Sequence, residues 1–256
     1  MPLRVNLSQT LHRQPYPAIL PTRPELSQVG RTVLVLGGST GIGHAIARNF
    51  CETGASRVII VARRRSVLED AVTELTKAYR NIEVIGRVGS FLSLTDATAL
   101  WDSLEQDGVK VDVLVLSATR MPALQPLLEQ GVARVWEDYE ANVHAPMVSV
   151  ERFYRQPGHD KQKYCVYVST HLIYNWHKAP QQPGYNLTRN AFTAALSMIS
   201  RDTPVEKMQI VSFHPGTVFT EAAKAMGLTG REPHIPWFDG KICPLGVPVE
   251  QRLILV

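Results

Sequence analysis

The 256-residue sequence has few cysteines and no long apolar run. Its three cysteines, Cys51, Cys165 and Cys243, show no Cys-x-x-Cys spacing and cannot all pair, so neither a disulfide framework nor a zinc site is indicated. No stretch approaches the roughly 20 apolar residues of a membrane-spanning helix, and the N-terminus has no apolar run of signal-peptide length. We therefore expect a cytoplasmic globular protein without a metal site, neither secreted nor inserted into a membrane.

A large excess of charge is also absent. Lysine and arginine total 27 against 23 aspartates and glutamates, a net charge of +4, and the basic residues are scattered except at Arg63, Arg64 and Arg65. Such a modest surplus does not indicate a general nucleic-acid or membrane surface. The cluster of three arginines therefore indicates a local function, such as a binding site for one anionic group.

What the sequence does contain is a regular alternation of two patterns. Residues 1–29 hold five of the 17 prolines and no sustained period, which predicts an N-terminal extended arm before one domain at 30–256. Short apolar runs then predict strands at 32–36, 57–62, 82–86, 112–116, 164–169 and 209–213, with helices at 42–53, 67–80, 95–105, 133–153 and 185–201. Strands that are apolar throughout are buried on both faces. The alternation therefore predicts an α/β fold, a single Rossmann-type doubly wound parallel sheet.

Three glycines lie between the first predicted strand and the first predicted helix. Gly37 permits a tight turn, Gly41 lets the backbone approach a pyrophosphate, and Gly43 lets the helix pack closely on the strand, with the helix N-terminus facing the phosphates. This arrangement predicts dinucleotide binding. The alternative is that the glycines only form a tight turn and bind no ligand. A phosphate-loop nucleotide hydrolase is disfavoured because no Lys-Ser or Lys-Thr follows the glycines.

The end of the second predicted strand bears on which dinucleotide is bound. NAD sites usually place an acidic residue there to accept from the ribose 2′-hydroxyl, but this sequence has Arg63 and Arg64. Two cations suit a 2′-phosphate, so we predict NADP(H) as the cofactor. The alternative is a solvated basic turn before a helix.

These motifs resemble those of the short-chain dehydrogenase/reductase family, from about residue 30 to 227, and the N-terminal arm resembles the leader of fungal members of specialised metabolism. The family pattern Thr-Gly-x-x-x-Gly-x-Gly is matched with Leu36 in place of the threonine. The family's Asn-Asn-Ala-Gly after the fourth strand is matched only at Ala118. Within the glycine loop, the resemblance implies cofactor binding by Gly37, Ser39, Gly41, Ile42 and Gly43.

The resemblance also implies a catalytic set. Asn142 matches the asparagine that holds a water in the family's proton relay, and Thr170 matches the catalytic serine, with Ser169 beside it. Either hydroxyl can donate to a substrate carbonyl. The alternatives are a polar residue inside a long helix and ordinary hydroxyls at a strand end.

The family's acid-base pair is Tyr-x-x-x-Lys, and its one literal copy here is Tyr174 with Lys178. Two prolines follow that copy closely, so no helix can hold its side chains on one face. Tyr185 instead begins a helical pattern with Arg189 one turn later. A phenol needs a nearby cation to exchange its proton at neutral pH, and Arg189 supplies the charge, although it cannot readily share a proton. A helix-surface pair or an inactive site is the alternative.

Two further features lie toward the C-terminus. The resemblance implies that Pro215 and Gly216 turn the chain under the nicotinamide and that Thr220 bonds its carboxamide; an ordinary strand-to-helix turn is the alternative. After Gly227 the resemblance fades, which predicts a truncated or diverged C-terminal end.

The favoured hypothesis is an NADP(H)-dependent oxidoreductase, of the ketoreductase or alcohol dehydrogenase type, acting on a small metabolite in fungal secondary-metabolite biosynthesis. Its small-molecule substrate is not identified by the sequence, and the resemblance implies a homodimer or homotetramer. A catalytically impaired protein that binds a cofactor or a partner is the alternative, favoured by Arg189 and the lost Asn-Asn-Ala-Gly. A degenerate product without a stable fold is a third hypothesis, and it rests only on the C-terminal tail.

Overall fold

A computed structural model of the protein describes residues 16–122, 125–159, 161–173, 183–216, 218–225 and 229. The predicted C-terminal divergence and the Tyr174 and Lys178 pair lie outside these residues, as does Cys243. Within them, Cys51 and Cys165 are buried free thiols. None of the described helices combines the length and the apolarity needed to span a lipid bilayer.

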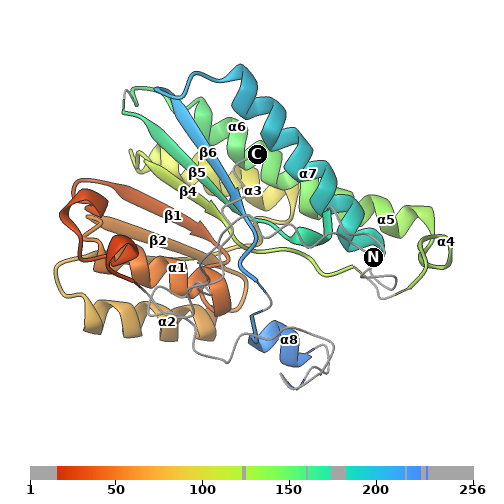
Figure 1. Cartoon of the computed structure of the whole chain (residues 1–256), viewed down its shortest axis with the longest axis horizontal. Helices are drawn as coiled ribbons and strands as arrows, with labels where there is room; N and C mark the ends of the chain where they lie inside the picture. The colour runs from red at the N-terminus through yellow and green to blue at the C-terminus, as the bar shows by residue number, and fades with distance from the viewer. Residues whose placement is uncertain are drawn as a thin grey trace.

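Six parallel strands form one sheet, as the apolar runs predict (Figure 1). Their order is β3-β2-β1-β4-β5-β6. The first three strands follow one another outward from β1 in one direction and the last three outward from β4 in the other, so β1 and β4 lie side by side at the centre of the sheet. The fold is therefore the doubly wound α/β fold expected from the sequence. The strands are β1 Thr32–Leu36, β2 Arg57–Ala62, β3 Glu83–Val88, β4 Val113–Leu116, β5 Lys163–Val168 and β6 Met208–Phe213.

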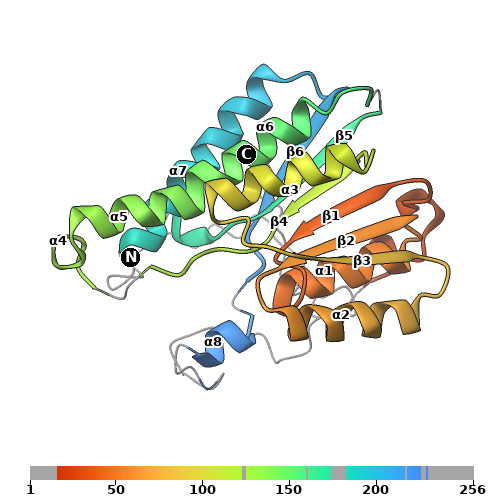
Figure 2. The ribbon, with the colours of Figure 1, turned by 180° about the vertical axis from the view of Figure 1, so that it is seen from behind.

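Helices cover both faces of the sheet. One face carries α1 Gly41–Glu52 and α2 Arg65–Ala78, and the other carries α3 Leu94–Gln106, α6 Ala145–Tyr154 and α7 Pro183–Asp202 (Figures 1 and 2). Alternate strand residues point to opposite faces: Val33 belongs to the core beneath α1 and α2, whereas Leu34 belongs to the core beneath α3, α6 and α7. Burial on both faces explains why the central strands β1 and β4 are almost entirely apolar, whereas β3 at the edge carries Glu83 and Arg87 and is only partly buried.

The helix expected over residues 133–153 is continuous but not uniform. It consists of α5 Val132–Tyr139, a π-helical segment η3 Glu140–His144, and α6. Such π segments inside α-helices are rare and occur frequently at functional sites, and this one contains Asn142. The remaining elements are η1 Pro17–Ile19, η2 Pro24–Leu26, η4 His171–Ile173, and two short helices that the sequence analysis did not predict, α4 Leu127–Gln130 and α8 Glu221–Ala225.

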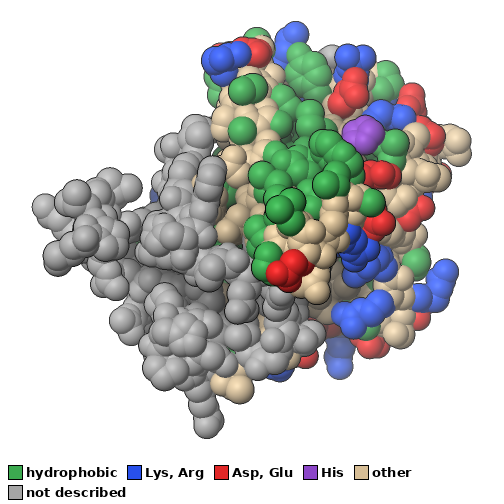
Figure 3. Space-filling model, turned by 90° about the vertical axis from the view of Figure 1, so that its right-hand side faces the viewer, with side chains coloured by type: hydrophobic (Ala, Val, Ile, Leu, Met, Phe, Trp, Pro, Cys, Tyr) green, Lys and Arg blue, Asp and Glu red, His purple; other side chains and the backbone are tan. Residues whose placement is uncertain are grey.

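Hydrophobic side chains gather on the side of the molecule that carries α4, α5 and the start of α7 (Figure 3). Leu128, Val132 and Trp136 are among the most exposed large apolar side chains, and Leu187 and Met198 on α7 are also exposed. Exposed apolar patches of this kind are more often contact surfaces than chance features.

Candidate functional site

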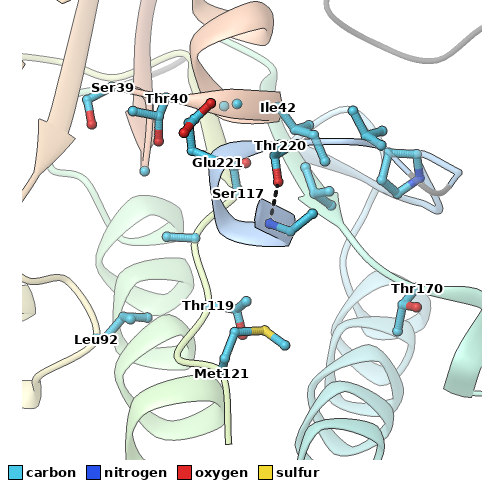
Figure 4. A pocket seen from close by; sticks show the side chains of 18 of the residues that line it. Ser39, Thr40, Ile42, Leu92, Ser117, Thr119, Met121, Thr170, Thr220 and Glu221 are labelled. Carbon is cyan, nitrogen blue, oxygen red and sulfur yellow. Dashed lines mark hydrogen bonds between the residues drawn. The ribbon is translucent and has the colours of Figure 1, made fainter. Parts of the chain in front are cut away.

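The carboxyl ends of the strands open onto a cavity of about 600 Å³ (Figure 4). Loops after β1, β2, β3, β4, β5 and β6 all contribute to its wall, together with the first turns of α1 and α7. Among the predicted site residues, the wall includes Gly37, Ser39, Gly41, Ile42, Gly43, Arg63, Arg64, Thr170, Tyr185, Arg189, Pro215, Gly216 and Thr220. Asn142 is the predicted site residue that does not line it.

The glycine loop has a geometry that side chains would not allow. Gly37 and Gly41 have φ values of +88° and +57°, in the left-handed region that favours glycine. A Cβ atom on Gly43 would lie only 2.1 Å from the carbonyl oxygen of Gly37, so the loop and α1 could not approach this closely with any other residue. Thr40 precedes α1 and makes no side-chain capping bond, which leaves the first N–H groups of α1 for a ligand. This loop fits the pyrophosphate of a dinucleotide.

Arg63 and Arg64 lie at the edge of the cavity, between β2 and α2. Both are exposed, and within the described part of the chain neither has an ion pair with an acidic side chain. Arg65 differs, because it lies 3.8 Å from Glu69 and is not part of this cavity wall. Two unpaired guanidinium groups beside the cavity suit a phosphate group.

The loop after β3 also reaches the cavity, through Ser90, Phe91 and Leu92, and the sequence analysis missed it. The signal was available, because parallel strands end at one edge and the loop after every strand reaches that edge. Its residue types match no cofactor-binding motif. Leu92 faces the cavity opposite Thr119 in the view of Figure 4.

Asn142 lies outside the cavity wall and fixes the loop after β4 by hydrogen bonds. Its Oδ1 accepts from the Arg120 N–H at 2.8 Å and from the Thr119 hydroxyl at 3.0 Å, and its Nδ2 donates to the Arg120 carbonyl at 2.8 Å. The side chain is only 3% exposed. Nδ2 also lies 3.4 Å from the hydroxyl of Thr188, which itself donates to the Gly184 carbonyl at the start of α7. Asn142 thus connects the β4 loop to the helix that carries Tyr185.

The two hydroxyls after β5 have different surroundings. The hydroxyl of Ser169 lies 3.1 Å from that of Thr193 on α7, which ties it to the protein interior. Thr170 accepts from the Leu172 N–H at 3.3 Å, and its own proton has no acceptor among the described residues. The Thr170 hydroxyl is therefore the better placed of the two to donate to a ligand in the cavity.

Tyr185 lies in the first turn of α7 and is half-buried in the cavity wall. Arg189, one turn later, is 4% exposed and donates from its guanidinium to the carbonyl oxygen of Val168. The centre of its guanidinium lies over the Tyr185 ring, 5.7 Å from the ring centroid, and over the Tyr167 ring at 4.5 Å. No acidic side chain of the described residues pairs with it. Arg189 is thus a buried cation beside the phenol.

Past β6, Pro215 and Gly216 carry the chain along the cavity toward α8. The Thr220 hydroxyl accepts from the Ala223 N–H at 3.3 Å, the bond drawn in Figure 4, and so caps the start of α8. Glu221 also faces the cavity, but its carboxylate pairs with Lys224 at 2.5 Å. Among the described residues, no group of histidine, cysteine or acidic side chains is arranged to hold a metal ion.

Comparison with known proteins identifies similar chains. The family model described as short chain dehydrogenase matches residues 31–229. A "Short chain dehydrogenase/reductase" of Claviceps purpurea is 30% identical over 224 residues, which cover 86% of this chain and 73% of the relative. The "Short chain dehydrogenase/reductase AacuD" of Aspergillus aculeatus is 27% identical over 213 residues, covering 83% of this chain and 72% of the relative.

Solved structures share the fold. The Pseudomonas aeruginosa RhlG/NADP active-site complex has a TM-score of 0.70 with 22% sequence identity, covering 82% of this chain and 80% of that one. The L-sorbose reductase of Gluconobacter frateurii, solved with NADPH and L-sorbose, has a TM-score of 0.70 with 19% identity, covering 82% and 79%. At these identities the likeness shows the fold alone.

The role of Asn142 in holding the β4 loop predicts the effect of Asn142→Asp. A carboxylate can still accept from the Arg120 N–H, but it cannot donate to the Arg120 carbonyl and places two oxygens against each other. We expect a loss of about 1–3 kcal/mol in the free energy of unfolding, measured by urea denaturation. Asn81→Asp is the matched control, because Asn81 is exposed, and it should change stability by less than about 0.5 kcal/mol. Equal stability of the two variants would contradict this role.

Proposed function

Because the chain belongs to the short chain dehydrogenase family, we propose that it is an NADP(H)-dependent oxidoreductase acting on a carbonyl or secondary alcohol of a small metabolite. The observation that carries the proposal is the single cavity into which the glycine loop, two unpaired arginines and the Tyr185 and Arg189 pair all face. A nicotinamide cofactor would supply or accept the hydride. The protein's own residues bind the two reactants, orient them and move the proton.

The glycine loop and the N-terminus of α1 would hold the pyrophosphate, and Arg63 with Arg64 would hold the 2′-phosphate that distinguishes NADP(H) from NAD(H). Thr220, with Pro215 and Gly216, would border the nicotinamide end. The NADP named for the Pseudomonas aeruginosa structure and the NADPH named for the Gluconobacter frateurii structure support this choice of cofactor.

The proton would pass through Tyr185. In reduction its hydroxyl would donate to the substrate oxygen, and in oxidation it would accept the proton of the alcohol. The Thr170 hydroxyl would donate to the same oxygen, and the buried charge of Arg189 would stabilise the phenolate form. Asn142 would organise the proton relay indirectly, since its side chain is occupied by the β4 loop.

Apolar side chains in the cavity wall favour an apolar substrate. Met121, Leu172 and Val218 line the same cavity as Tyr185, and each presents an apolar side chain. Small-molecule sites are usually lined by apolar groups with a few polar groups that fix orientation, here the hydroxyls of Thr170 and Tyr185. A lipophilic ketone, aldehyde or secondary alcohol is the substrate class that fits.

The wider setting of the protein is also part of the proposal. The fungal relatives from Claviceps purpurea and Aspergillus aculeatus support a place in fungal secondary-metabolite biosynthesis. A homodimer or homotetramer, a cytoplasmic location and the division into an arm at 1–29 and a domain at 30–256 stay predictions. The alternative is a catalytically impaired member of the family, which Arg189 in place of lysine favours.

Replacement of Arg63 tests the cofactor assignment. Arg63→Ser should weaken NADPH binding by about tenfold or more, because a charge-assisted contact with the 2′-phosphate is lost, and should leave NADH binding nearly unchanged. Isothermal titration calorimetry of the purified protein measures both affinities. Arg65→Ser is the matched control, because Arg65 pairs with Glu69 outside this cavity wall. Equal weakening of NADPH and NADH by Arg63→Ser would contradict the assignment.

Replacement of Tyr185 tests the chemistry. Tyr185→Phe removes the proton donor and keeps the ring, so turnover of a lipophilic ketone should fall at least about 100-fold while NADPH affinity changes little. The measurement is NADPH oxidation with a panel of lipophilic ketones and aldehydes, with calorimetry for affinity. Turnover by Tyr185→Phe at the wild-type rate would overturn the role of Tyr185. A wild-type protein that binds NADPH but turns over none of the panel would favour the impaired alternative.

A further inference from the structure

The Tyr167 side chain, on β5, has no part in the chemistry described above, yet it makes the nearer of the two aromatic contacts with Arg189. The guanidinium centre lies 4.5 Å from the centroid of the Tyr167 ring, against 5.7 Å for the Tyr185 ring. The guanidinium also donates to the carbonyl of Val168, the residue after Tyr167. One strand therefore supplies both a ring and a carbonyl to the same cation.

Arg189 needs this support because its burial is costly. A guanidinium stays charged in proteins, and a buried charge without partners is strongly disfavoured. Among the described residues Arg189 has no acidic partner, and its Nε is buried without a hydrogen bond. Besides the Val168 carbonyl, an aromatic face can stabilise a desolvated guanidinium, through the attraction of the cation to the ring.

Tyr167 is well suited to give a fixed and neutral face. It is 2% exposed, and the ring of Phe192 meets it edge to face, with centroids 4.8 Å apart and an angle of 89° between the ring planes. Burial raises the pKa of Tyr167 to about 12, which outweighs the opposite effect of the nearby Arg189. The phenol therefore stays protonated at neutral pH and does not compete with Tyr185 for the proton.

We propose that Tyr167 is a positioning residue for the reaction, whose ring holds the Arg189 guanidinium against the Val168 carbonyl and beside Tyr185. This inference rests on the proposed function, because the position of Arg189 matters for catalysis only if Tyr185 exchanges a proton. It explains how arginine can take the place of lysine. A planar guanidinium stacks on a ring, whereas an ammonium acts as a compact point charge and depends less on the ring.

The first measurement needs no substrate. In protein labelled with ¹⁵N-arginine, the Nε–Hε resonance of Arg189 is assigned by its loss in Arg189→Lys. Stacking on a ring should shift this resonance away from those of exposed arginines. Tyr167→Phe keeps the ring and should retain the shift, and Tyr167→Leu should abolish it. Phe153→Leu is the matched control, because Phe153 is a fully buried ring that packs against Trp101, whereas the Arg189 guanidinium lies over the rings of Tyr167 and Tyr185.

The second measurement is kinetic. Tyr167→Leu should lower kcat about tenfold or more and move the pH of half-maximal turnover upward, whereas Tyr167→Phe and Phe153→Leu should each lower kcat less than about threefold. In the Arg189→Lys background, Tyr167→Leu should lower kcat by a much smaller factor than it does in the wild-type protein. This coupling would not arise from a general loss of packing.

The outcomes separate the inference from the function on which it rests. If Tyr167→Leu leaves the Arg189 resonance and kcat at their wild-type values, the positioning role is wrong and the proposed function stands. If Tyr167→Leu and Phe153→Leu lower kcat equally with no coupling to Arg189, the positioning role is also overturned. If the resonance responds as expected but the wild-type protein turns over no carbonyl compound, the placement of Arg189 is supported and the proposed function fails.

Discussion

The parallel direction of all six strands is the constraint on which the site depends. Parallel pairing places every strand's carboxyl end at one edge of the sheet, so residues as far apart as Gly37 and Thr220 line one cavity. Helices on both faces of the sheet bury the central strands beneath this cavity. The loops can then vary in sequence: Leu116, Ser117 and Thr119 replace three of the four residues of the family's Asn-Asn-Ala-Gly, while the loop after β4 still lines the cavity.

Three arginines in the cavity wall form a second common feature of the site. Arg63 and Arg64 are exposed cations at one end, whereas Arg189 is a buried cation at the other end, and none of the three has an acidic partner among the described residues. The exposed pair suits an anionic ligand that arrives from water. The buried guanidinium instead depends on the Tyr167 ring and the Val168 carbonyl, which fix its direction relative to Tyr185.

The sequence predicted the sheet well because its physical signal is local. Six apolar runs coincide with six strands to within a residue or two, because the central strands are buried on both faces and carry few polar residues. The glycine positions were equally readable, because a φ value of +88° at residue 37 and the close approach at Gly43 leave few other residue types possible. The π-helical segment around Asn142 was not predicted. The Asn142 amide in it bonds to the backbone of Arg120, 22 residues earlier, and a contact between such distant residues leaves no periodic signal in the sequence. The contact of Tyr167 with Arg189 also joins separate elements, and no spacing in the sequence indicates it.

The most direct test of the account is a calorimetric titration of the purified wild-type protein with NADPH and with NADH. The account predicts saturable binding of NADPH at one site per chain and an affinity for NADH at least about tenfold weaker, since only NADPH carries the phosphate that Arg63 and Arg64 suit. A folded protein, shown by a cooperative thermal transition, that binds neither dinucleotide would contradict the central claim that this cavity is a cofactor site. Equal affinity for the two would contradict the role of the arginines.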